Sequence, residues 1–185
     1  CGACAEACIQ KGRIQNEFDA ALGKRGAIYV PFPQAVPLKY TIDDTRCIFL
    51  TKGKCGKAPA CREACRAGAI NFEQKGEEVT LNIGAIVLAP GYELFDATKR
   101  AEYGYGIYGN VVTSLEFERI LSSSGPFSGA VRRLSDGRTP KKIAFIQCVG
   151  SRDEKTNTYC SSVCCMYAIK EAVIAQEHIH GLSVT

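Results

Sequence analysis

The chain has 185 residues, of which 46% are hydrophobic and 23% charged, and its formal net charge is +4. This composition is that of a globular protein and excludes a disordered chain. The basic residues are scattered along the sequence, so nothing favours binding to nucleic acid. No apolar run is long enough to span a membrane and no signal peptide is visible, which predicts a soluble, cytoplasmic protein without a membrane span.

The two ends of the sequence are unusual. The only methionine is Met166, and the chain opens on Cys1, inside a cysteine motif. Its last letters, HGLSVT, read like the first residues of a strand. We therefore expect the sequence to be a fragment of a longer protein, truncated at both ends.

Eleven cysteines dominate the sequence, and they fall into three clusters. An odd number in a chain with long periodic segments and no export signal disfavours a disulfide scaffold. Metal binding is the stronger interpretation, with iron–sulfur favoured over zinc because the only histidines, His178 and His180, lie at the far end. The clusters are Cys1, Cys4 and Cys8; Cys47, Cys55, Cys61 and Cys65; and Cys148, Cys160, Cys164 and Cys165.

The first two clusters have the pattern of a two-cluster ferredoxin. CGACAEAC has the spacing C-x2-C-x3-C, which is a bacterial ferredoxin run without its first cysteine. In such proteins the last cysteine of each run binds the cluster of the other run. This pattern groups Cys8 with Cys47, Cys55 and Cys61, and it groups Cys1 and Cys4 with Cys65 and a cysteine before residue 1.

Two departures from the ferredoxin pattern leave the alternatives open. Ile9 and Arg66 stand where a proline usually follows the last cysteine, and the second run has longer gaps, with Pro59 inside one of them. A zinc site or unmetallated thiols therefore remain possible interpretations. After Cys65 the sequence RAGAINFE predicts an apolar strand.

Further along the chain, the sequence predicts a connector and then elements of an α/β domain. Residues 24–43 contain three prolines and read as an extended linker that crosses the surface; the alternative, from their aromatic and aliphatic content, is that one side is buried against a cofactor. Residues 83–88 form a continuous apolar run that predicts a buried parallel strand, ending at small residues that a ligand can approach. Residues 113–125 predict a helix capped by Thr113 or Ser114 and stopped by Gly125. Residues 143–146 predict another strand.

Residues 141–172, KKIAFIQCVGSRDEKTNTYCSSVCCMYAIKEA, begin like a nucleotide-binding strand, turn and helix. The turn offers only Gly150, whereas a dinucleotide needs several glycines for close approach of the backbone to the pyrophosphate. We therefore expect no nicotinamide cofactor here. Four cysteines stand where the phosphate loop would be.

These residues resemble the A subunit of heterodisulfide reductase and its relatives among the iron–sulfur flavoproteins. The resemblance covers nearly the whole chain and is carried by NEFDAALGKRGAIYVPFPQAVP, GAIVLAPGYELFD, YGNVVTSLEFERIL, KKIAFIQCVGSRD and YCSSVCCMYAIKEA. It implies a partial thioredoxin-reductase-like α/β fold with FAD between its halves, an inserted ferredoxin-like α+β domain, and an additional [4Fe–4S] cluster.

Residue by residue, the resemblance implies several roles. Cys148, Cys160, Cys164 and Cys165 would bind the additional cluster, which makes three clusters in all. We expect Ser161 or Ser162 to cap a helix whose first turn carries the cysteine pair, where free N–H groups and the helix dipole favour thiolates. Ala89 and Gly91 would contact FAD, although Pro90 replaces the family's threonine. Lys170 would lie near the flavin ring.

We therefore predict a ferredoxin-like domain over residues 1–80 and part of a flavoprotein domain over residues 81–185. The resemblance implies electron transfer between FAD and [4Fe–4S] clusters in a reductase complex with other subunits and electron-donor proteins. The family links its flavin to electron bifurcation. The alternatives are a related flavoprotein of sulfur metabolism and a zinc-stabilised interaction module without redox activity.

Overall fold

The computed structural model describes all 185 residues of the chain. They form two compact units, one of Cys1–Phe18 with Lys24–Glu93 and one of Asp19–Gly23 with Leu94–Thr185. The sequence predicted a boundary between residues 80 and 81, whereas the structure places it after Glu93.

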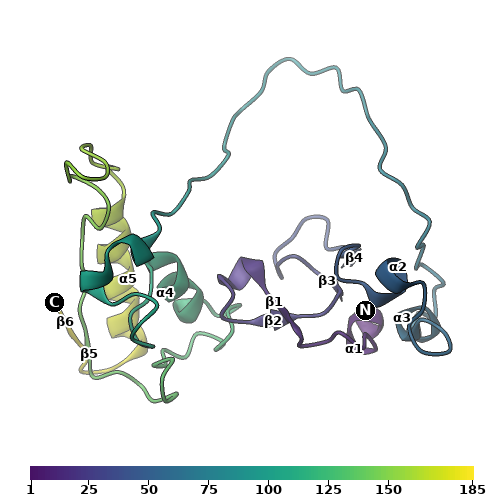
Figure 1. Cartoon of the computed structure of the whole chain (residues 1–185), viewed down its shortest axis with the longest axis horizontal. Coiled ribbons are helices and arrows are strands. Elements are labelled where there is room, and N and C mark those ends of the chain that lie inside the picture. The colour runs from purple at the N-terminus through teal and green to yellow at the C-terminus, as the bar shows by residue number, and fades with distance from the viewer. The chain divides into compact units, whose positions relative to one another are not determined.

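The first unit is built from very short elements. Its helices have four or five residues and its strands have two. Both strand pairs are antiparallel, β1 with β2 and β3 with β4. The elements are α1 (Ala3–Glu6), β1 (Ile14–Gln15), β2 (Lys24–Arg25), β3 (Ile28–Tyr29), β4 (Thr41–Ile42), α2 (Ile48–Lys52) and α3 (Ala60–Ala64), with the 3-10 turn η1 (Glu17–Asp19) after β1 (Figure 1).

Cysteine takes part in the core of this unit. The buried residues are Ile14, Ala27 and Cys47, and Cys8 is among the partly buried residues that pack against them. Ala27 and Ile28 are 2% and 3% exposed, so the proline-containing segment 24–43 is more than a surface linker. Its first half supplies β2, β3 and part of the core.

Two predicted strands are absent from the first unit. Residues 66–73 have no strand, and residues 83–88 run as an extended, exposed segment in which Val87 is 92% and Leu88 84% exposed. The prediction of a buried parallel strand was therefore wrong for this structure. Such a strand is stable only between neighbouring strands that accept its backbone hydrogen bonds, and no strand of the chain pairs with this segment.

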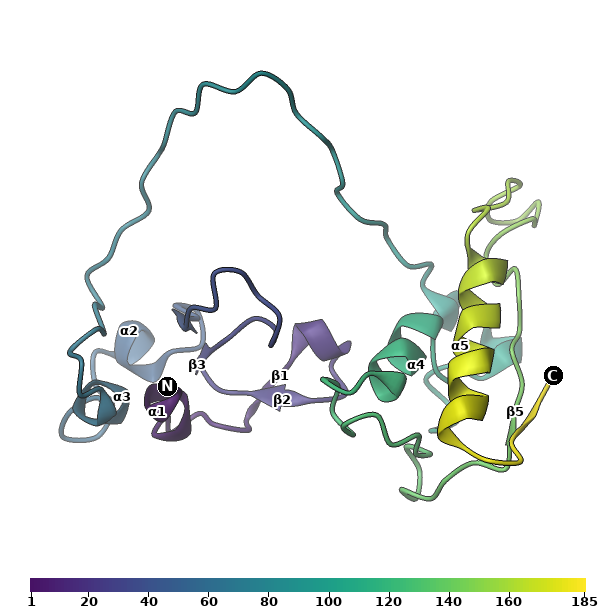
Figure 2. The same cartoon turned by 180° about the vertical axis from the view of Figure 1, so that it is seen from behind.

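The second unit packs two helices beside a small parallel sheet. Helices α4 (Ser114–Leu121) and α5 (Cys164–His178) lie side by side in both views (Figures 1 and 2). Strand β5 (Lys142–Ile143) pairs in parallel with β6 (Ser183–Val184), so the expected strand at the end of the sequence is confirmed. The 3-10 turns η2 (Ala97–Lys99) and η3 (Ala101–Tyr103) precede α4. No helix of the chain is both long and apolar enough to cross a membrane.

Helix α4 begins as the sequence predicts. The Thr113 hydroxyl accepts a hydrogen bond from the Glu116 backbone N–H, while the Glu116 carboxylate accepts one from the Thr113 N–H, which completes a capping box. The helix ends at Leu121, before the predicted stop at Gly125. Gly125 turns the chain back so tightly that a Cβ there would lie 1.9 Å from the Arg119 carbonyl oxygen.

A buried ion pair lies beside the core of the second unit. The Arg119 guanidinium donates from Nε and Nη2 to Asp19 Oδ1, at 3.1 and 2.9 Å. Both residues are at most 8% exposed. Phe117, Ile120 and Leu121 on the same helix form the core with Val131, Ala175 and Leu182. The pair therefore ties residues 19–23 to α4.

Breaking this pair should destabilise the second unit strongly. Arg119→Met keeps the apolar stem but leaves the Asp19 carboxylate buried without its cation, so we expect a loss of about 3–5 kcal/mol in the free energy of unfolding. Arg133→Met is the control, because Arg133 and Asp136 form an exposed pair, for which we expect at most about 1 kcal/mol. Urea denaturation measures both. Equal losses in the two variants would contradict the role assigned to Arg119.

Candidate metal centres

Four cysteines of the first unit line one cavity. Cys8 follows α1, Cys47 is the N-cap of α2, Cys55 lies in the turn after α2, and Cys61 lies on α3. The remaining lining is mostly apolar: Ala7, Ile9, Gln10, Ala27, Ile48, Phe49, Pro59 and Ala60. Three short helices thus bring together the four cysteines that the ferredoxin pattern groups, and their role as metal ligands stays a prediction.

The electrostatics of this cavity favour a bound cation. Burial raises the pKa of the Cys61 thiol, and the nearby Cys8 and Cys47 raise it further. Several thiolates cannot share an apolar cavity without mutual repulsion unless positive charge lies between them. The irons of an iron–sulfur cluster would supply that charge, so the chemistry of the donor set fits such a cluster.

The other ferredoxin cysteines of the first unit have different surroundings. Cys4 is buried on α1 and Cys1 is exposed. Cys65 is the C-cap of α3, and its sulfur accepts a hydrogen bond from the Ala69 N–H at 3.4 Å. Helices α1 and α3 pack against each other, which places Cys4 and Cys65 on neighbouring elements.

The second unit gathers four cysteines at the start of α5. Cys164 and Cys165 are the first two residues of the helix, as the sequence predicts. The negative charge of Cys164 raises the pKa of Cys165, and Cys148 and Cys160 raise it further, so these three thiols lie within electrostatic range of Cys165. A hydrogen bond from Ser161 lowers the pKa of Cys164.

The predicted helix cap is wrong in detail. Val163, rather than Ser161 or Ser162, is the N-cap, and no side chain caps the helix. Ser162 adopts a left-handed backbone conformation with φ of 64°, and its N–H donates to the Cys160 sulfur at 3.4 Å. The serines therefore bond to the thiols, and the backbone N–H groups of Cys164 and Cys165 at the start of α5 also donate to the Cys164 sulfur, which lowers its pKa further.

A hydrogen-bonded loop brings Cys148 to Cys160. The Arg152 N–H donates to the Tyr159 carbonyl, and the Asn157 amide donates to the Gly150 carbonyl at 2.9 Å. These bonds fold residues 148–160 back on themselves, so that a cysteine from each end reaches the helix start. Gly150 has φ of 75°, and a Cβ there would lie 2.3 Å from the Phe95 ring.

The cysteine side chains are not arranged to hold a single metal ion. No group of three His, Cys, Asp or Glu side chains anywhere in the chain comes close enough to hold one metal ion. Cysteines around a [4Fe–4S] cluster are spaced more widely, because four irons and four sulfides lie between their sulfurs.

The residues expected to contact FAD belong to different units. Ala89 and Gly91 lie in the exposed segment of the first unit, and Lys170 is an exposed residue of α5 in the second. The segment carrying Ala89 and Gly91 forms no strand, so it does not build an enclosed flavin surface. Their contact with a flavin stays a prediction.

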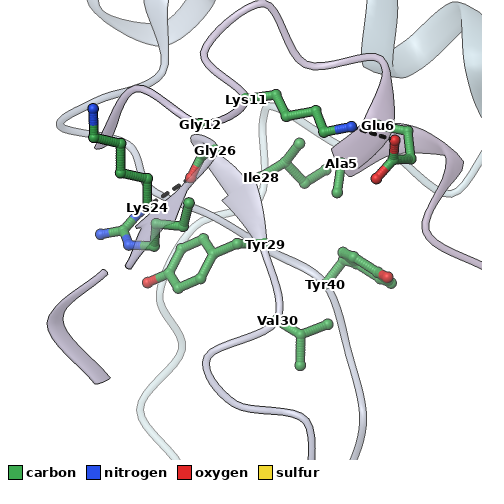
Figure 3. A pocket seen from close by; sticks show the side chains of 11 residues that line it. Ala5, Glu6, Lys11, Gly12, Lys24, Gly26, Ile28, Tyr29, Val30 and Tyr40 are labelled. Carbon is green, nitrogen blue, oxygen red and sulfur yellow. Dashed lines mark hydrogen bonds and ion pairs between the residues drawn. The ribbon is translucent and has the colours of Figure 1, made fainter. Parts of the chain in front are cut away.

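The first unit also has a larger cavity, of about 280 Å³, that contains no cysteine. Tyr29 and Tyr40 form opposite walls around Ile28, and an ion pair from Lys11 to Glu6 lies at one side (Figure 3). Arg25 packs on the Tyr29 ring at 3.9 Å, and its charge is already paired with Glu17 and Asp43. The cavity has no cysteine or histidine in its lining, and its one carboxylate, Glu6, is already paired with Lys11.

Sequence reasoning missed Glu171, a charged residue that is only 2% exposed. Ala168 and Ala175 are buried three and four residues away on either side of it. This spacing marks the core-facing side of a helix, and it is the signal that could have identified a buried acid.

No family model matches this chain. Curated relatives do match it along nearly its whole length. In Methanopyrus kandleri, the second A-type iron-sulfur subunit of CoB–CoM heterodisulfide reductase is 56% identical over 178 residues, which are 96% of this chain and 26% of the relative. The corresponding iron-sulfur subunit of the Methanocaldococcus jannaschii enzyme is 52% identical over 179 residues, which again are 96% of this chain and 26% of the relative.

A third relative, from Methanothermobacter marburgensis, is 45% identical over 186 residues and is named as the A subunit of an H(2):CoB-CoM heterodisulfide,ferredoxin reductase. The names of these relatives are those of subunits of oxidoreductase complexes, and two of them are named as iron-sulfur subunits. More narrowly, the chain is homologous to the A subunit of heterodisulfide reductase, which confirms the resemblance inferred from its motifs. It spans about a quarter of the length of these relatives.

A substitution at Gly150 should disturb the loop that carries Cys148. Gly150→Ala combines a left-handed backbone with a clash against Phe95, so we expect a loss of about 2–4 kcal/mol in the free energy of unfolding. Gly137→Ala is the matched control, because Gly137 has φ of 70° but open space around it, and should lose about 1 kcal/mol. Urea titrations compare the two, and similar losses would show that the Phe95 contact does not hold the loop.

Proposed function

We propose that this chain is an electron-transfer segment of a heterodisulfide reductase-type complex and that its cysteines hold [4Fe–4S] clusters. One observation carries the proposal: each compact unit gathers its own group of four cysteines, one around a cavity and one at a helix start. The names of the relatives, which include an iron-sulfur subunit, support it. When bound, the clusters would supply one-electron transfer.

The two groups offer a cluster different surroundings. Apolar side chains such as Ile48 and Phe49 line the first cavity and keep water away from it. Cys160 and Cys165 of the second group are exposed, and the Cys164 sulfur accepts hydrogen bonds from the Ser161 hydroxyl and from backbone N–H groups at the start of α5. Because hydrogen bonds to sulfur and solvent exposure set cluster potentials, the two sites would accept electrons at different potentials.

We further propose a third cluster, on Cys1, Cys4, Cys65 and one more ligand, and a thioredoxin-reductase-like fold that binds FAD. Ala89, Gly91 and Lys170 are proposed to contact the flavin, and all three are exposed and free to do so. These proposals, and electron bifurcation with them, rest on the resemblance of the motifs. The proposed partners are other subunits of the reductase, and the proposed acceptor is a disulfide such as the one in the relatives' names.

Two cysteine variants test the proposal and serve as controls for each other. Cys164→Ala should remove about four irons from the anaerobically purified protein and leave the first-unit clusters, whereas Cys61→Ala should remove about four irons and leave the cluster on α5. Iron and sulfide analysis with electron paramagnetic resonance follows each cluster.

Three outcomes would contradict either the two proposed groups of cysteine ligands or the proposed role in electron transfer. Zinc in place of iron and sulfide would indicate the non-redox interaction module. Loss of every cluster in either variant would show that the groups are not independent. Unchanged iron content in Cys164→Ala would remove that residue from the ligand set.

A further inference from the structure

Glu171 is a buried acid without a visible partner. Its side chain is 2% exposed, and neither carboxyl oxygen has a hydrogen-bond partner. It lies between Ala168 and Ala175 on the face of α5 that packs against α4. A buried carboxylate without hydrogen bonds is very costly, so such a group keeps its proton.

The charged groups on the elements packed against α5 do not neutralise Glu171. On α4, Glu118 adds negative charge near it, Glu116 is engaged in the capping box, and Arg119 is paired with Asp19. On α5 itself, the Tyr167 hydroxyl donates to Glu118, and Lys170 is exposed. Strand β6 has no ionisable residue.

The consequence is an acid that titrates above neutrality. Burial and, to a smaller extent, the charge of Glu118 raise the pKa of Glu171 to about 8. Glu171 is therefore mostly neutral at pH 7 and becomes a carboxylate in mildly alkaline solution. Glu118 is itself exposed.

Helix geometry brings this acid near the second cysteine group. Glu171 follows Cys164 by seven residues, which is close to two turns, so the two residues lie on the same side of α5 about 10 Å apart. At an effective dielectric constant of about 20, one charge at that distance changes a proton affinity on the order of tenfold. An electron added at the start of the helix would therefore raise the proton affinity of Glu171.

We propose that Glu171 sets the potential of the cluster bound by Cys148, Cys160, Cys164 and Cys165: as a neutral acid it permits an electron to enter, and as a carboxylate it opposes that electron. This inference rests on the proposed cluster. Linkage makes the effect reciprocal, so reduction raises the proton affinity of Glu171. The electron comes from the one-electron donor that reduces the cluster. The proton comes from water, so one O–H bond of water breaks, the O–H bond of Glu171 forms and hydroxide is released to the solvent.

The pH dependence of the potential has a definite sign. At pH values below its pKa, Glu171 is neutral in both redox states, and the midpoint potential of the cluster is independent of pH. Above that pKa the oxidised state loses the proton first, and the potential falls until the reduced state loses it as well. A tenfold change in proton affinity corresponds to a total fall of about 59 mV for a one-electron couple.

Redox titration of this cluster between pH 6 and 10, monitored by electron paramagnetic resonance in the anaerobically purified protein, tests the proposal with three variants. Glu171→Gln should give a potential that does not change with pH. Glu177→Gln is the matched control, because Glu177 is an exposed acid on the same helix, and it should behave as the wild type. Glu118→Gln removes the neighbouring charge and should start the fall at a lower pH.

Each possible result decides the matter. A wild-type potential without pH dependence, or a fall that persists in Glu171→Gln, overturns the role of Glu171 while leaving the cluster in place. Absence of any cluster on these four cysteines overturns the proposed function and this inference with it. If Glu171→Gln does not hold its cluster, Glu118→Gln decides, and an unchanged onset of the fall there overturns the proposal.

Discussion

The cysteines of the first unit are part of its packing: Cys47 and Cys8 belong to its small core, and Cys55 and Cys61 line the adjoining cavity with them. Its helices and strands are too short to be stable alone, and Cys47 is one of the three buried residues in its core cluster. Thiols gathered in an apolar cavity repel each other once they ionise, and a bound metal group removes that repulsion. Under the proposed function, cluster binding and folding of this unit are one process.

In the second unit the cysteines lie outside the hydrophobic core. Its core of Phe117, Ile120, Leu121 and their neighbours contains no cysteine, and the buried Arg119–Asp19 pair adds to it. The cysteines stand at the edge, on a hydrogen-bonded loop and the first turn of α5. Here the fold positions the thiols, whereas in the first unit the thiols take part in the fold. The backbone N–H groups at the start of α5 favour negative charge on these thiols, whereas a Glu171 carboxylate, under the proposed role, would oppose it.

Local signals were predicted from the sequence, and features that need tertiary partners were not. The Thr113–Glu116 capping box and the cysteine pair at the start of α5 depend on residues a few positions apart. Residues 83–88 have the composition of a buried strand, but a strand also needs neighbours, and nothing in the chain pairs with them. The burial of Glu171 was not predicted, because an acidic residue on a helix is usually exposed and this one is buried only through packing against α4.

The measurement that most directly tests the central claim is the metal and sulfide content of the anaerobically purified wild-type protein, together with its visible absorbance. The account predicts iron and inorganic sulfide in equal amounts and a brown protein that bleaches on reduction. Zinc without sulfide, in a colourless protein of the same fold, would contradict it.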